Sequence, residues 1–315
     1  MMSRLCLLVL LTFTLAGSAF AQPEKQRMLV WSDRQGSLTP VIEMVKDYHC
    51  SLALSPDDQY LVVEVGPRRD GDLWLVELER KTLRQLTHDE AGAYDPLFSP
   101  DGTFVYFSSK RDGRWGLFRK RTDGSGDEER ITQNDHLQIL SSISPDGRTL
   151  AYFQREGEED WDIWVLSPEG KSPPRELSEG SFAAVAPVYS PDGGWMVYQA
   201  NESGDWEVYA RPVSGHGDKI KVSPTGSGIP WGRPSKVLWN RDGLRLFSVS
   251  PEETVWEVVV SAGGDTLEPG SPQELFRLSD QSLLRATRGC WEISGDGQRF
   301  FFIRQLEEEA TTPGN

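Results

Sequence analysis

Three observations predict an all-β fold, a six-bladed β-propeller with four-stranded antiparallel blades. A turn of the Ser-Pro-Asp-Gly type recurs along the chain, and apolar strand-like runs flank each copy. The last copy lacks two strands, which the N-terminal segment can supply. A repeat of about 40–50 residues that contains only strands and turns is typical of propeller blades. The runs between the turns fit no helical period.

The turn motif occurs six times at nearly regular spacing. Successive copies lie 44, 45, 46, 50 and 54 residues apart. Proline fixes φ at the second position, and aspartate and glycine favour the tight reversal that joins two strands. The last two copies are degenerate. In chain order the copies read "SPDD" at 55–58, "SPDG" at 99–102, 144–147 and 190–193, "NRDG" at 240–243 and "SGDG" at 294–297.

Each copy is expected to form one blade. A short strand precedes the turn, as in "DPLF" at 95–98, and a longer one follows it, as in "FVYFSS" at 104–109. A polar hairpin leads to a third strand such as "WGLFRKR" at 115–121, and a weaker fourth strand follows in several copies. Val, Tyr, Phe and Trp are typical of strands. Six tryptophans are expected on third strands, where packing between blades is favoured over a sugar-stacking platform: Trp74, Trp115, Trp161, Trp164, Trp206 and Trp256.

The two chain ends are predicted to close the ring together. The sixth copy stops after its second strand near Gln305, while residues 27–43 contain a third-strand-like run and a weak fourth strand. This closure would remove the free sheet edge of an open array. We therefore expect one propeller domain at 22–306, followed by a disordered tail at 307–315.

The first 21 residues are predicted to be a signal peptide. A short basic start ends at Arg4, an apolar run follows at 5–17, and the small residues Ala19 and Ala21 suit a signal peptidase. Cleavage after Ala21 would leave 294 residues (315 less 21) and change the net charge from −15 to −16. We expect a periplasmic or secreted protein without a transmembrane span. A retained N-terminal anchor is the alternative.

Charge and cysteine content narrow the possible roles. The strongly acidic chain would repel nucleic acid, so DNA and RNA binding is not expected. Cys50 and Cys290 are the cysteines that remain after cleavage, too few for a disulfide scaffold. In a closed ring their strands would be neighbours at the channel. The sequence leaves two states possible for this pair, a disulfide or two buried thiols.

The repeats resemble the TolB-like propeller, whose Pro-Asp repeats are WD40-like. The resemblance covers about residues 27–305 and rests on "SPDG", the aromatic strand after it and the "W-x-I/V-W/Y" pattern. "LVWSDRQGSLTPV" at 29–41 and "YSPDGGWMVYQANESGDWEVYARPVSG" at 189–215 are more similar still to the extracytoplasmic propellers attached to some bacterial Ser/Thr kinases. The sequence has no Gly-rich kinase loop, so the resemblance implies an exported propeller without the kinase.

No sequence motif points to catalysis or to a metal. The four histidines have no HExxH spacing, a GxSxG elbow is absent, and the acidic turns lack the spacing of an EF-hand. We therefore predict no catalytic residues, no metal and no cofactor.

The predicted binding surface is formed by the segments that lead into the first strands. First strands line the channel of a propeller, and loops at its mouth commonly bind ligands. The segment that leads into the fifth blade, "SPTGSGIPWGRPSKV" at 223–237, is the longest. Trp and Arg are enriched at binding hot spots, although an ordinary connector is the alternative. The candidates are Tyr48, His49, Tyr94, Asp95, Gln138, Trp231, Arg233, Arg285 and Arg288.

The sequence therefore predicts a monomeric, non-catalytic exported propeller. It would bind an envelope or extracellular protein, a peptide or a small ligand, in a sensing or scaffold role. The alternative is a propeller enzyme, a lyase or hydrolase with a site in the channel. A cluster of titratable side chains in the channel would favour the enzyme, whereas an apolar or aromatic patch would favour binding.

Overall fold

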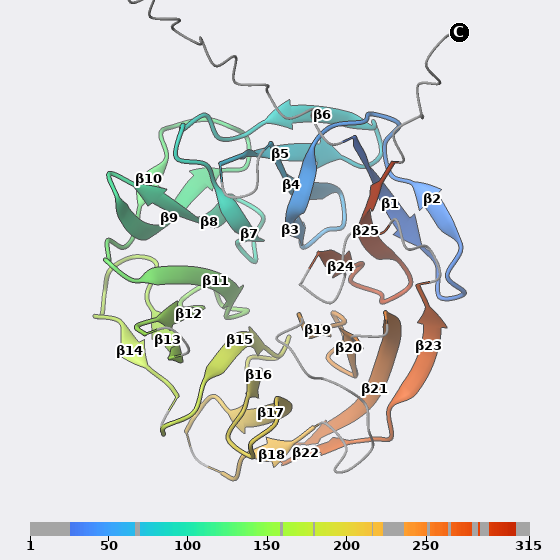
Figure 1. The fold of residues 1–315 in the computed structure, drawn as a ribbon. Helices are drawn as coiled ribbons and strands as arrows, with labels where there is room; N and C mark the ends of the chain where they lie inside the picture. Colours follow the sequence, from blue (N-terminus) through green and yellow to red (C-terminus); the bar gives the residue numbers. More distant parts are fainter. Residues whose placement is uncertain are drawn as a thin grey trace, which may run out of the picture.

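Six antiparallel sheets surround a central axis in the computed structural model (Figure 1). The structure describes residues 26–66, 70–157, 160–178, 180–215, 217–222, 236–250, 253–263, 266–278, 283 and 290–306. The all-β, six-bladed propeller is confirmed. No helix long and apolar enough to span a membrane occurs within these ranges.

The first four blades follow the chain, and each places its strands in sequence order from the channel to the rim (Figure 1). Blade 1 contains β3 (Tyr48–Leu54), β4 (Tyr60–Val65), β5 (Asp72–Glu77) and β6 (Thr82–Gln85). Blade 2 contains β7 (Tyr94–Phe98), β8 (Phe104–Arg111), β9 (Arg114–Arg121) and β10 (Glu129–Arg130). Blade 3 contains β11 (Leu137–Ile143), β12 (Leu150–Arg155), β13 (Trp161–Leu166) and β14 (Arg175–Glu176). Blade 4 contains β15 (Ala184–Tyr189), β16 (Trp195–Ala200), β17 (Glu207–Pro212) and β18 (Ile220–Lys221).

Blade 5 departs from the four-stranded pattern. It contains β19 (Leu238–Trp239), β20 (Arg245–Val249), β21 (Thr254–Gly263), β22 (Thr266–Pro269) and β23 (Gln273–Arg277). The third strand, β21, is ten residues long, and each half pairs with a different outer strand. One short outer strand cannot cover so long an edge, so β23 pairs with the first half and β22 with the second.

Blade 6 closes the ring with strands from both ends of the chain, which confirms the sequence prediction. It contains β24 (Trp291–Ile293), β25 (Phe300–Gln305), β1 (Arg27–Ser32) and β2 (Leu38–Pro40). The N-terminal β1 lies beside β25 and pairs with it along its whole length (Figure 1).

Ion pairs join the N-terminal part of this closing blade to the neighbouring blades on both sides. The guanidinium of Arg27 donates to Asp47 at 2.8 Å and to the carbonyl of Tyr48 at 2.7 Å, which ties β1 to blade 1. On the other side, Arg34 lies 2.9 Å from the buried Glu257 of blade 5. Because both partners of each pair are at least partly buried, removing one would leave a charge poorly solvated.

The recurring turn is held by a hydrogen-bond pattern that explains its first and third letters. In the second copy, the hydroxyl of Ser99 donates to Asp101 at 2.6 Å and accepts the main-chain N–H of Phe104 at 2.9 Å. The hydrogen bond from Ser99 lowers the pKa of Asp101. The same serine-to-aspartate bond, 2.5–2.6 Å long, occurs in the first, third, fourth and sixth copies. In "NRDG", Asn240 replaces the serine and accepts the N–H of Arg245 at 2.9 Å.

The core lies within the blades and between neighbouring blades. Phe300, Phe301 and Phe302 are consecutive and buried, because both faces of a second strand pack against other blades. Among the tryptophans that the structure describes, the fully buried ones are Trp195 on β16 and Trp291 on β24. The six tryptophans assigned to third strands are all only half-buried. The tryptophans on this second strand and this first strand are thus more deeply buried than those assigned to third strands.

Candidate functional site in the central channel

A cavity of about 500 Å³ occupies the channel and is lined by residues of all six innermost strands. Along β7, β11 and β15, buried residues alternate with half-exposed ones, as in β11, where Ile139, Ser141 and Ile143 are half-exposed. Because successive side chains of a strand point to opposite faces, the half-exposed set faces the channel. The cavity reaches the turn motif, since Pro56, Asp58 and other turn residues also line it.

The wall formed by blades 2, 3 and 4 is mostly apolar. Leu97 on β7, Ile139 and Ile143 on β11, and Val188 on β15 line this side. Asp95 is the charged residue that the described part of these blades contributes to the lining. An occupant of this half of the cavity therefore gains mainly from burial of apolar surface.

The innermost strands β3, β7, β11 and β15 are bulged, and the bulges on β7 and β15 change how side chains meet the channel. The register shifts between Tyr94 and Leu97 on β7, and between Val185 and Val188 on β15. Inside these bulges, Asp95 and Ala186 line the cavity with φ of 52° and 53°, in the left-handed region. This conformation is unfavourable for residues other than glycine, and such strain is commonly found at functional sites.

The wall formed by blades 5, 6 and 1 is charged. Lys236, just before β19, places its ammonium 2.6 Å from Glu292 on β24 and 3.4 Å from the carbonyl of Leu52 on β3. Both charged side chains are largely buried, with 26% and 12% of their surfaces exposed. The other carboxylate oxygen of Glu292 accepts the N–H of Ile293 at 3.0 Å.

A second polar cluster lies at the turn end of the same wall. Asp58 of blade 1 accepts a hydrogen bond from Arg241 of blade 5 at 2.9 Å and from the N–H of Gly295 of blade 6 at 3.1 Å. The N–H of Arg241 in turn donates to the carbonyl of Gly295 at 2.7 Å. A Cβ at position 295 would overlap the Arg241 guanidinium, so the glycine makes room for it.

Each of these three residues occupies a position at which its turn copy departs from "SPDG". Asp58 replaces glycine, and Arg241 and Gly295 each replace proline. In the regular copies, the turn glycine of one blade lies near the turn proline of the blade before it, as with Gly193 and Pro145. The departures thus exchange an apolar contact for a polar one where the ring closes. The degenerate copies were visible in the sequence, but the contact between their substituted residues could be found only from the closed ring.

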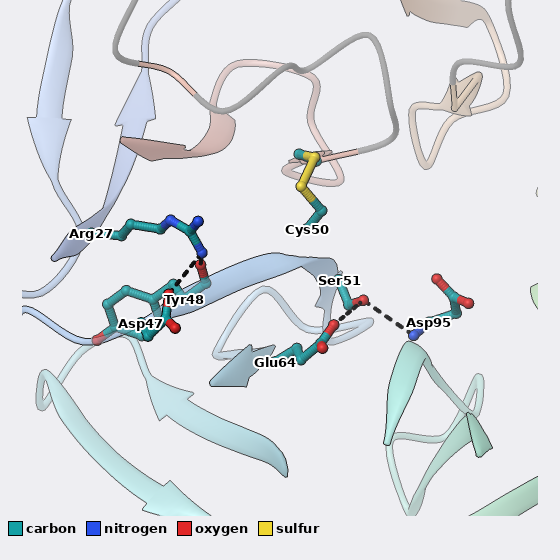
Figure 2. Close-up of a disulfide and its surroundings, with 8 residues drawn as sticks. Arg27, Asp47, Tyr48, Cys50, Ser51, Glu64 and Asp95 are labelled. Atoms are coloured by element: carbon teal, nitrogen blue, oxygen red, sulfur yellow. Dashed lines mark hydrogen bonds and ion pairs between the residues drawn. A yellow bond between two sulfur atoms is a disulfide. The ribbon is translucent and has the colours of Figure 1, made fainter. Parts of the chain in front are cut away.

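A disulfide joins the first and last blades at the channel. Cys50 on β3 is bonded to Cys290, which directly precedes β24, and their Cα atoms lie 4.2 Å apart (Figure 2). Of the two states that the sequence left open, the structure has the bridge. Cys50 lines the cavity, whereas Cys290 is fully buried.

Next to the disulfide, Ser51 connects blade 1 with blade 2. Its hydroxyl donates to the buried Glu64 at 2.8 Å and accepts the main-chain N–H of Asp95 at 3.3 Å (Figure 2). This arrangement helps to hold the bulged backbone of β7 against β3.

The predicted site residues are distributed unequally. Asp95 lines the cavity, whereas Tyr48, Tyr94 and Gln138 are buried in packing. The hydroxyl of Tyr48 donates to the carbonyl of Met44 at 3.0 Å, and burial raises its pKa to about 12. Four other candidates lie outside the described residues: Trp231, Arg233, Arg285 and Arg288.

The structure shows the surroundings of three further candidates, Tyr94, Gln138 and His49. The ring of Tyr94 makes an edge contact with Trp115, with centroids 6.0 Å apart. Gln138 accepts from Thr132 at 2.7 Å and donates to a second glutamine at 3.1 Å. His49 is half-buried beside Cys50. In the described ranges, no three His, Cys, Asp or Glu side chains gather closely enough to share a metal ion.

Comparison with known proteins relates the chain to propellers of one type. The TolB beta propeller domain family matches residues 19–163. An uncharacterized protein of Agrobacterium fabrum, Atu1656, is 36% identical over 76 residues, which are 24% of this chain and 26% of that protein. The match thus spans about a quarter of the curated relative.

Solved structures share the fold at low sequence identity. The proposed TolB of Agrobacterium tumefaciens superposes with a TM-score of 0.65 at 18% identity, covering 90% of this chain and 99% of that one. TolB of Acinetobacter baumannii gives 0.59 at 14% identity, covering 90% of this chain and 65% of that one. An oligogalacturonate lyase in complex with manganese gives 0.57 at 16% identity, covering 86% and 80%. At these identities the likeness concerns the fold alone.

Proposed function

We propose that this TolB-like β-propeller is an exported, non-catalytic binding module whose ligand occupies the central channel. The observation that carries the proposal is the cavity of about 500 Å³, which has an apolar wall opposite a charged one. Volumes of this size, lined by apolar groups and a few placed polar groups, are typical of ligand sites. The ligand enters from the face that carries the turn motif, because turn residues line that end.

The way its carboxylates are held supports a binding role for the charged wall. The carboxylates of Asp58 and Glu292 each accept a main-chain N–H as well as a cationic side chain. Groups held in this way are rigid, and rigid polar groups orient a ligand at little entropic cost. Trp231 and Arg233 remain candidates for partner contacts on sequence grounds alone.

Export is supported by two independent observations. The N-terminal sequence has the charge and apolar pattern of a signal peptide. The disulfide between Cys50 and Cys290 requires an oxidising compartment to persist. We therefore propose a periplasmic or secreted location for the mature protein.

Filling the cavity tests the binding role. Val188→Trp places a bulky side chain on the apolar wall, and Val259→Trp makes the same change on the outside of β21, where Val259 is 48% exposed. Each variant is immobilised and incubated with an envelope extract and with a pool of short peptides, and bound components are identified by mass spectrometry.

We expect at least one component to be retained by the native protein and by Val259→Trp but lost from Val188→Trp. Thermal unfolding of both variants establishes that they are folded. Equal retention by a folded Val188→Trp protein would refute the channel as the binding site.

A further inference from the structure

We propose that the channel ligand is a short apolar peptide whose C-terminal carboxylate lies against Lys236 and Arg241. This inference rests on the proposed channel-binding function and specifies the chemistry of the ligand. It follows from the donors that the charged wall offers, from the opposite apolar wall and from the dimensions of the cavity.

The charged wall presents donors rather than acceptors. The carboxylates of Glu292 and Asp58 are engaged by donors of the protein on both sides, as described above. The ammonium of Lys236 has three N–H donors and the guanidinium of Arg241 has five. One side-chain hydrogen bond from Arg241 is found within the described ranges, and 53% of its side chain is exposed. An anionic group is therefore the complement of this wall.

The opposite wall sets the orientation of the ligand. Leu97, Ile139, Ile143 and Val188 favour an apolar body on the side of blades 2 to 4. A ligand with apolar side chains and one terminal carboxylate satisfies both walls at once.

The dimensions and the hydroxyl groups favour a peptide over an alkyl chain. The apolar wall runs from Ile139 to Ile143, and because β11 is bulged between Leu140 and Ser142 it covers three steps of the partner strand, of about 3.3 Å each, or roughly 10 Å. An extended tripeptide spans about 10 Å. Ser141 lies between the two isoleucines and also lines the cavity. An alkyl chain would bury its hydroxyl without a partner, whereas a peptide amide can bond to it.

The test compares ligands that differ only in the terminal charge. A pool of N-acetylated tripeptides of Leu, Ile, Val and Phe is prepared with free C-terminal carboxylates, and a second pool carries C-terminal amides. Decanoate serves as a carboxylate on an alkyl chain. Binding to the purified protein is measured by affinity selection with mass spectrometry, and by titration calorimetry for selected peptides. We expect the free acids to bind at least about tenfold more tightly than the amides.

Lysine variants with a matched control separate charge recognition from structural damage. Lys236→Met is expected to weaken binding of the free acid about tenfold or more and to leave the amide unchanged. Glu292→Gln removes the competing carboxylate and should tighten binding of the acid. The control is Lys221→Met, because Lys221 forms a pair with Glu207 of nearly the same length and exposure, 2.7 Å with 27% and 17%, at the outer edge of blade 4. It should bind like the native protein.

Each outcome decides the inference separately from the proposed function. If acids and amides bind equally and Val188→Trp abolishes both, the channel binds peptides but the carboxylate assignment is overturned. If decanoate binds and no tripeptide does, the peptide assignment is overturned. If Glu292→Gln weakens binding of the acid as much as Lys236→Met does, the contribution of Lys236 is structural and the proposed contact is wrong.

Discussion

Loss of the disulfide between Cys50 and Cys290 should lower the stability of the whole propeller. The two cysteines are 240 residues apart in a chain of 315, so the bridge closes a very long loop. In the chain-entropy relation a loop of this length contributes about 5.5 kcal/mol, and removal of native disulfides typically costs about 2–5 kcal/mol. We therefore expect a loss of about 3–5 kcal/mol.

The corresponding change in melting temperature follows from the size of the fold. Unfolding entropy is about 2.1 cal/mol/K per residue, or roughly 0.6 kcal/mol/K for the propeller. A loss of 3–5 kcal/mol then lowers the Tm by about 5–8 °C. The variant is Cys50→Ser with Cys290→Ala, because Cys290 is fully buried and a serine there would bury a hydroxyl.

Thermal and urea unfolding of the native, reduced and doubly substituted proteins provide the measurement. The reduced protein and the double variant should agree with each other, and reductant should not affect the variant. Unchanged unfolding of both would refute the entropic reasoning. Two titratable thiols in the denatured, unreduced mature protein would show that the bridge is absent.

Three further predictions concern the chain ends and the turn. Protein recovered after export should begin at Gln22, and retention of residue 1 would exclude the predicted cleavage. Deletion of residues 22–43 removes β1 and β2 and should expose β25, so aggregation or unfolding is expected; an unchanged, stable monomer would contradict it. Ser99 holds the pKa of Asp101 below its unfolded value of about 3.9, which contributes stability above pH 4 that is lost as the pH falls through the lowered pKa. Ser99→Ala should thus be less stable than the native protein at pH 7 and lose less stability between pH 5 and pH 2 in denaturant titrations, and equal losses would refute this role.

The blades and their closure could be predicted from the sequence because their signals are local. A serine bonds to an aspartate two residues away and to an N–H five residues away, as Ser99 does, so each turn is encoded within one short segment. Alternating apolar residues identify the strands in the same way. The last copy lacks two strands and the N-terminal run can supply them, so closure of the ring by both chain ends could be predicted as well.

The pairing of β21 with two outer strands was not predicted from the sequence, because it depends on partner strands rather than on a local signal. The strand continues through residues 261–263, "SAG", which do not have a strong strand composition, and it is extended there by pairing with β22. Partner strands, rather than intrinsic preference, determine such extensions.

The candidate site, by contrast, depended on the tertiary structure. Sequence reasoning assigned ligand contacts to segments leading into the first strands, yet the side chains of Tyr48, Tyr94 and Gln138 are buried in packing. The side of a strand that faces the channel depends on bulges, such as the one at Asp95, that no residue pattern marked.

The charged wall shows the same limit most clearly. Lys236 and Glu292 lie 56 residues apart, and Asp58 and Arg241 lie 183 apart. Each residue taken alone is an ordinary charged side chain near a turn. The sequence by itself determined six blades and the strands that join its ends, because those follow from contacts within short segments. Only the closed ring decided which charges meet, because it places the innermost strands of blades 5, 6 and 1 side by side around one channel.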